Sequence, residues 1–152
     1  MKDSKEILTS ALNTVQMGQI GIRSALDYTV RADLRQALES QLREYDEIET
    51  QLDSIASSRS WELKEVDPAV RIMSNMMLKA RLIGGDTDSK IAAMMINGNT
   101  RGMILGLKNL HRFHSNDPKV ENVCQKLLDT EIENIRQMQG SPLSLIGRIL
   151  KN

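Results

Sequence analysis

The side chains best placed to do chemistry in this sequence are carboxylates and amides inside segments of helical periodicity. Glu131 and Asn134 stand three residues apart, and Gln41 and Glu44 repeat that spacing just before Tyr45. Helical bundles that bind two metal ions place inward-facing Glu side chains and Glu-x-x-His pairs at mid-bundle. Here amides, a carboxylate and a phenol stand where such bundles carry histidine. The candidate mid-bundle layer consists of Gln19, Gln41, Glu44, Tyr45, Asn97, Glu131 and Asn134.

This layer has two interpretations. In the first, it is a sparse metal or small-ligand pocket with Glu131 and Glu44 as its anionic ligands. In the second, it is a polar layer that fixes helix register, in which the amides and the phenol satisfy one another's hydrogen bonds. Amides are weak metal ligands, and one or two carboxylates do not neutralise two divalent ions. We therefore favour the polar layer and predict no catalytic residue, no cofactor and no metal.

Three further features are weaker candidates for chemistry. His111 and His114 share one helix face at the end of a segment, where cationic side chains are favourable without any metal. Cys124 has no basic neighbour in sequence, so we interpret it as a small buried side chain. The sequence also has two methionine pairs, Met76-Met77 and Met94-Met95. We interpret them as side chains that fill an irregular core, and the alternative interpretation is a Met-rich surface that binds helical partners.

The elements that must position these residues are helices. Apolar residues recur every three or four positions over residues 4–28, 33–55, 86–114 and 119–138. Ser4 is a plausible first cap, and Asp67-Pro68 predicts the start of a shorter helix. That helix should bury Met73 and Met77 and end at Gly84-Gly85.

The order of these segments predicts an all-α fold. Residues 29–32 form a connection so short that the helices on either side of it must pack as an antiparallel pair. Residues 57–85, in contrast, form a long connection with its own short helix. Two antiparallel hairpins joined by a long crossover are the layout of ferritin-like four-helix bundles, in which the second and third long helices run parallel. We expect this bundle over residues 1–140 and a short amphipathic tail over residues 141–152.

Composition narrows the classes of partner. The chain has 20 Lys+Arg and 20 Asp+Glu, so no net charge attracts nucleic acid. No apolar run reaches the roughly 18 residues of a membrane span, and the charged start of the chain does not match a signal peptide. One cysteine fits a reducing compartment, and we expect a cytoplasmic protein. The apolar tail and Met-rich helices favour a homodimer.

Three stretches also carry a family resemblance. LESQLREYDEI (residues 38–48), DSKIAAMMINGNTRG (residues 88–102) and KLLDTEIENI (residues 126–135) resemble helices of small uncharacterised ferritin-like proteins of anaerobic Firmicutes. The resemblance extends over residues 7–138 and implies a ferritin-like bundle in a cytoplasmic bacterial protein. Spore-coat proteins and metal-binding ferritin-like enzymes are more distant relatives. This chain departs from those enzymes, because Glu44 or Tyr45 and Asn134 stand where histidine is expected.

The sequence thus predicts a non-enzymatic ferritin-like bundle that acts as a scaffold or interaction protein, without a working di-iron centre. One alternative is a ferritin-like metalloprotein that binds iron or manganese, or handles peroxide, through an atypical site. The other is a spore-coat or stress-associated structural protein.

Overall fold

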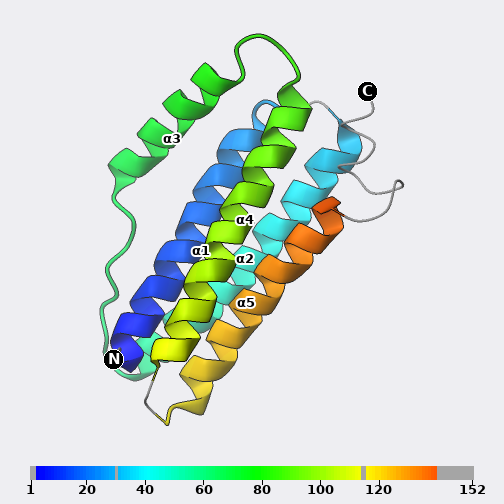
Figure 1. The fold of residues 1–152 in the computed structure, drawn as a ribbon. Helices are drawn as coiled ribbons and strands as arrows, with labels where there is room; N and C mark the ends of the chain where they lie inside the picture. Colours follow the sequence, from blue (N-terminus) through cyan, green and yellow to red (C-terminus); the bar gives the residue numbers. More distant parts are fainter. Residues whose placement is uncertain (1–2, 30, 114–115, 140–152) are drawn as a thin grey trace.

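The computed structural model describes residues 3–29, 31–113 and 116–139, and these form an all-α protein (Figure 1). The long helices α1, α2, α4 and α5 lie side by side, with the shorter α3 outside them. The predicted tail, residues 141–152, lies outside the described residues. The helices are α1 (Ser4–Leu26), α2 (Ala32–Ser58), α3 (Pro68–Arg81), α4 (Thr87–Arg112) and α5 (Pro118–Gln139).

Local sequence signals set the helix starts and the sharpest turn. Asp3, one residue before the predicted Ser4, caps α1 in a capping box: its carboxylate accepts from the Glu6 backbone N–H at 2.9 Å, and the Glu6 carboxylate accepts from the Asp3 N–H. Asp67 caps α3 with proline at its first turn, as predicted. Gly84 and Gly85 take φ values of +101° and +93°, which glycine adopts at little cost, and they turn the chain into α4.

The chain path gives two antiparallel hairpins, α1–α2 and α4–α5. Between them, residues 59–86 carry α3 back along the outside of α1 to the end of the protein at which α2 began. As a result α2 and α4 run in the same direction, as Figure 1 shows. The core lies among the four long helices, and α1 contacts both α2 and α4. None of the helices in the described parts of the chain is long and apolar enough to cross a membrane.

The crossover is attached to the bundle by polar contacts. The side-chain oxygen of Gln16 on α1 accepts a hydrogen bond from the Val66 backbone N–H at 2.9 Å. At the start of α5, the Asp117 carboxylate accepts from Ser4 and forms an ion pair with Arg59. That pairing holds the pKa of Asp117 well below its usual range. One carboxylate therefore connects the beginnings of α1 and α5 to the end of α2.

The short helix α3 departs from the prediction. Met73 and Met77 were expected to be buried, but they are 61% and 54% exposed, and Leu78 is the buried residue of this helix. The reason is that α3 packs mainly against α1, so only a narrow stripe of its surface is covered. On α4, likewise, Ile104 and Leu107 are exposed although their spacing predicts burial.

Candidate functional site

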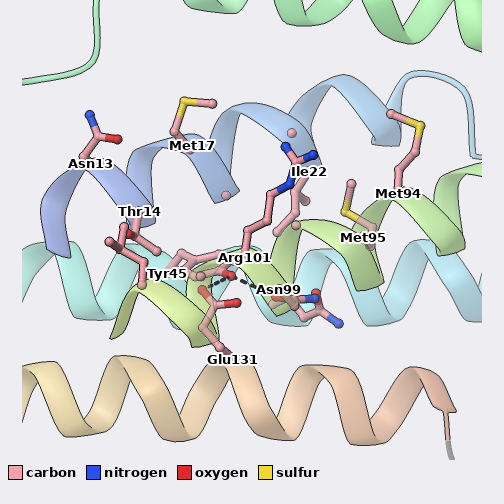
Figure 2. A pocket seen from close by; sticks show the side chains of 16 residues that line it. Asn13, Thr14, Met17, Ile22, Tyr45, Met94, Met95, Asn99, Arg101 and Glu131 are labelled. Atoms are coloured by element: carbon pink, nitrogen blue, oxygen red, sulfur yellow. Dashed lines mark hydrogen bonds between the residues drawn. The ribbon is translucent and has the colours of Figure 1, made fainter. Parts of the chain in front are cut away.

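A pocket of about 350 Å³ opens between α1 and α4 and reaches the centre of the bundle (Figure 2). This volume lies within the range of small-molecule sites, roughly 300–1,000 Å³. Its walls are mostly apolar or small, and its inner end is polar. The wall residues include Met17, Gly18, Gly21, Ile22, Met94, Met95, Gly98, Gly102 and Leu105.

Glu131 of α5 lies at the inner end of the pocket and is 1% exposed. Its Oε1 is 2.7 Å from the hydroxyl of Tyr45 on α2, and the same hydroxyl is 3.1 Å from Oδ1 of Asn99 on α4. A phenol has a single proton and can donate fully to one of these oxygens. Both bonds form at once when Glu131 is protonated, because Glu131 then donates to the phenol while Tyr45 donates to Asn99.

The surroundings of Glu131 favour that neutral state. Burial raises the pKa of Glu131 to about 7, against a smaller opposing effect of the hydrogen bond from Tyr45. Burial, followed by the nearby Glu131, also raises the pKa of Tyr45 well above its usual value. The carboxyl group therefore changes charge near neutral pH, whereas the phenol stays protonated.

Four buried polar atoms near this end have no hydrogen-bond partner among the described residues: Oε2 of Glu131, Nε2 of Gln41, and both side-chain atoms of Asn134. An unsatisfied buried polar group costs about 1–3 kcal/mol. We predicted a layer in which every polar side chain has a hydrogen-bond partner within the layer. That network is therefore only partly formed. Glu131 and Gln41 both line the pocket, so a molecule inside it could supply the missing partners.

Two glycines make room for these side chains. A Cβ atom on Gly18 would lie 2.8 Å from the Tyr45 ring, and one on Gly102 would lie 2.9 Å from the carboxyl carbon of Glu131. Both distances are too short for ordinary contacts. A Cβ on Gly98, one turn before Gly102, would meet nothing within 4 Å. Glycine at positions 18 and 102 thus allows Tyr45 and Glu131 to meet at the centre of the bundle.

We expect Gly18→Ala to lower the free energy of unfolding by about 1–3 kcal/mol, because the added methyl group displaces the Tyr45 ring from a packed position. Gly98→Ala is the matched control. It gains helix propensity without a clash and should stabilise the protein by about 1 kcal/mol. Urea-induced unfolding of the two variants measures both effects. If Gly18→Ala is as stable as Gly98→Ala, the Tyr45 ring is not fixed where we place it.

The structure brings together four of the seven predicted layer residues. Gln41, Tyr45, Glu131 and Asn134 are all buried at the centre of the bundle, on α2 and α5. Asn97 is exposed, which corrects the prediction, and Asn99 takes its place. Two residues along a helix are about 200° apart around its axis, so the two asparagines point in nearly opposite directions. The seven-residue spacing from buried Ala92 to Asn99 is the sequence signal that would have identified it.

Gln19 and Glu44 lie outside the pocket, which also corrects the prediction. Gln19 is buried, but its amide donates to Asp46 at 2.9 Å on another side of α1. Glu44 is half-buried in a surface hollow between α2 and α5, next to Lys126 and Glu133. Burial and nearby carboxylates raise the pKa of Glu44, yet the group does not share a site with Glu131.

Of the weaker candidates, the Met94-Met95 pair lines the pocket, whereas His111 and Cys124 do not. His111 is exposed on the last turn of α4, and His114 lies outside the described residues. Cys124 is buried on α5, as predicted, and burial raises the pKa of its thiol to about 11, so it stays an unreactive thiol at neutral pH. Within residues 3–29, 31–113 and 116–139, no three His, Cys, Asp or Glu side chains gather closely enough to hold a metal ion.

The donors at the inner end of the pocket do not fit a pair of metal ions. Glu131 is the single carboxylate among the residues that line it, and the position three residues after it carries an amide. Two divalent ions need more negative charge than this to offset their desolvation. What the arrangement offers instead is one titratable acceptor, a phenol and two amides beneath apolar walls.

Fold and site together define an all-α helical-bundle protein with an internal, mostly apolar pocket that ends at a buried carboxyl group. The chain is similar in structure to a DUF305 fragment from Deinococcus radiodurans whose crystal structure is known. The similarity covers 95% of this chain and 95% of that fragment. The TM-score is 0.73 and the sequence identity 16%, so the likeness shows a shared helical fold. No family model and no curated protein matches the chain.

Proposed function

We propose that this protein is a non-enzymatic, ferritin-like helical bundle that binds a small organic molecule in the pocket between α1 and α4. The observation that carries the proposal is the environment of the Glu131 carboxyl group. It is almost fully buried, its Oε2 has no partner among the described residues, and it lies at the end of a pocket of about 350 Å³. A buried unsatisfied acceptor is costly unless something in the pocket donates to it.

The ferritin-like assignment draws support from the chain path. Two antiparallel hairpins, a long crossover and parallel α2 and α4 are the features of that class. We also propose kinship with the small ferritin-like proteins of anaerobic Firmicutes and a cytoplasmic location, which a single buried cysteine fits. A metalloprotein is less well supported, because the pocket offers one carboxylate. The spore-coat or stress-associated role stays a hypothesis from the resemblance.

A variant that fills the pocket tests the binding proposal. Leucine at position 98 would extend from the open wall of the pocket, so Gly98→Leu should fold but exclude ligands, whereas Gly98→Ala keeps most of the volume. We expect small organic molecules to raise the melting temperature of wild type and Gly98→Ala, and not of Gly98→Leu. A ligand at 100 times its Kd stabilises by about 2.7 kcal/mol. Equal shifts in all three proteins would place binding elsewhere.

Metal content is the matching control. Wild type incubated with Fe(II) or Mn(II) and desalted should contain much less than one metal ion per chain by elemental analysis. A stoichiometric content that Glu131→Gln abolishes would replace the organic ligand with a metal centre.

A second candidate role, as an interaction protein, draws support from α3. Ile72, Met73, Met76 and Met77 are each more than half exposed on this helix. Apolar side chains gathered in this way mark association surfaces. We propose a homodimer in which the α3 helices of two copies cover each other. Light scattering should give twice the chain mass for wild type and the single chain mass for Met76→Glu; a monomeric wild type would contradict it.

A further inference from the structure

We propose that the ligand of the pocket is a small primary amine with an apolar body, whose ammonium group binds at the inner end against Glu131 and Asn99. This inference rests on the proposed function, because it names the chemical class of the molecule that the pocket takes.

Two acceptor oxygens at the inner end of the pocket favour a ligand with several donors, although Nε2 of Gln41 is an unpartnered donor there that an ammonium does not satisfy. When Glu131 is ionised, the single proton of Tyr45 goes to its Oε1, because a charged acceptor is the stronger one. Asn99 Oδ1, 3.1 Å from the same hydroxyl, then loses its donor, and Glu131 Oε2 has none among the described residues. Both residues line the pocket. A primary ammonium brings three N–H donors to these two oxygens, which a hydroxyl group with one donor cannot satisfy together.

The charges around Glu131 also favour a cationic ligand. No ion pair of Glu131 is found among the described side chains. The polar and charged residues that share the pocket with it are Gln41 and Tyr45 of α2, Asn13 and Thr14 of α1, and Asn99 and Arg101 of α4. In Figure 2 the Arg101 side chain extends away from the Glu131 carboxylate. An ionised Glu131 thus lacks a counter-charge, and a buried carboxylate is stable when a cation accompanies it.

The walls of the pocket favour an apolar body for the rest of the ligand. The sides of the pocket are made by apolar side chains and by glycines, whose missing side chains leave the space open. Methionine sulfur packs well against aromatic rings and adapts to irregular shapes. These walls fit an aliphatic or aromatic body. The charged side chain among them is Arg101, a cation that would repel a second positive charge on the ligand. The methionines concerned are Met17, Met94 and Met95.

Binding an amine in this way changes the protonation of the site. Burial raises the pKa of Glu131 to about 7 in the empty pocket, so about half of the carboxyl groups are neutral at pH 7. The ammonium binds the ionised form, and a neutral Glu131 must release its proton to solvent when the amine enters. The amine itself is charged throughout, since its pKa resembles that of lysine, about 10.4. Affinity should therefore fall as the pH falls below 7.

The experiment compares three primary amines of increasing size (isobutylamine, phenethylamine and tryptamine) with the alcohols of the same carbon skeletons, by isothermal titration calorimetry on the full chain. We expect at least one amine to bind wild type at least tenfold more tightly than its alcohol. Its affinity should fall about tenfold from pH 6 to pH 5, where Glu131 is mostly neutral, and titrations in buffers of different ionisation enthalpy should report proton release at pH 7.

Variants separate this inference from the proposed function. Glu131→Gln should bind amine and alcohol alike, and Gly98→Leu should bind neither. If the alcohols bind wild type as tightly as the amines, the pocket binds organic molecules but does not prefer a cationic ligand. If no amine and no alcohol binds, the proposed function fails as well. Equal binding of amine by wild type and Glu131→Gln would also overturn the inference, and the alcohol titration of that variant shows whether its pocket is intact.

Discussion

Leu38→Ala should lower the free energy of unfolding by about 2–5 kcal/mol. Leu38 lies on α2 with 0% of its surface exposed, within the cluster that α1, α2, α4 and α5 share. Removing its three outer carbons leaves a cavity that packed helices cannot close, and the loss combines the transfer of those carbons with the energy of the cavity.

Leu42→Ala, one turn further along α2, is the matched control. Leu42 is only partly buried at the edge of the same cluster, so its truncation should cost clearly less than that of Leu38. Urea-induced unfolding with a common slope measures both costs. Equal losses in the two variants would mean that α2 is rotated from the orientation described, with Leu42 as deep as Leu38.

Glu131→Gln should make the protein less sensitive to pH and more stable above pH 7. Burial raises the pKa of Glu131 to about 7 from 4.5, so the folded state binds more protons than the unfolded state between these values. Stability is then highest at low pH and falls as the pH rises through 7. For this one group the loss from pH 5 to pH 8 is about 2–3 kcal/mol. Glutamine keeps the shape and hydrogen-bonding groups of the neutral acid and removes the loss.

The expected measurement is urea unfolding at pH 5, 6, 7 and 8 for wild type, Glu131→Gln and Glu133→Gln. Glu133 lies on the same helix with half of its side chain exposed, so its variant should follow wild type. Burial also raises the pKa values of Glu44 and Asp53, which leaves a shallow slope of the same sign in every protein. The lowered pKa of Asp117 acts only in more acidic solution. Parallel pH profiles for wild type and Glu131→Gln would contradict a neutral buried Glu131.

Local signals in the sequence were enough for the helices and part of the site. Caps such as Asp67-Pro68 and the Gly84-Gly85 turn depend on neighbouring residues alone, and the structure has them where they were expected. Tyr45 and Glu131 were correctly placed in the interior because each continues an apolar stripe of its own helix. These features need no knowledge of how the helices pack.

The features that were missed depend on that packing. Asn97 and Asn99 both interrupt the apolar pattern of α4, and a 100° turn per residue decides which one faces inward. Gly98 and Gly102 lie one turn apart on α4 and are equivalent in helical periodicity, but Gly98 faces open space and Gly102 faces Glu131. The exposure of Met73 follows from α3 packing mainly against α1 at the outside of the bundle, which periodicity does not reveal. Orphaned atoms such as Glu131 Oε2 are visible only in three dimensions.

The most direct test of a ligand pocket built around Glu131 is an NMR titration of its side-chain carboxyl carbon, assigned by the signal missing from Glu131→Gln. In the free protein the midpoint should lie near pH 7, as burial of the group predicts. At saturating phenethylamine, or whichever amine of the series binds most tightly, the midpoint should fall by at least one pH unit, because the ammonium favours the ionised carboxylate. A midpoint near 4.5 in the free protein, or one that no amine moves, would contradict a ligand pocket built around Glu131.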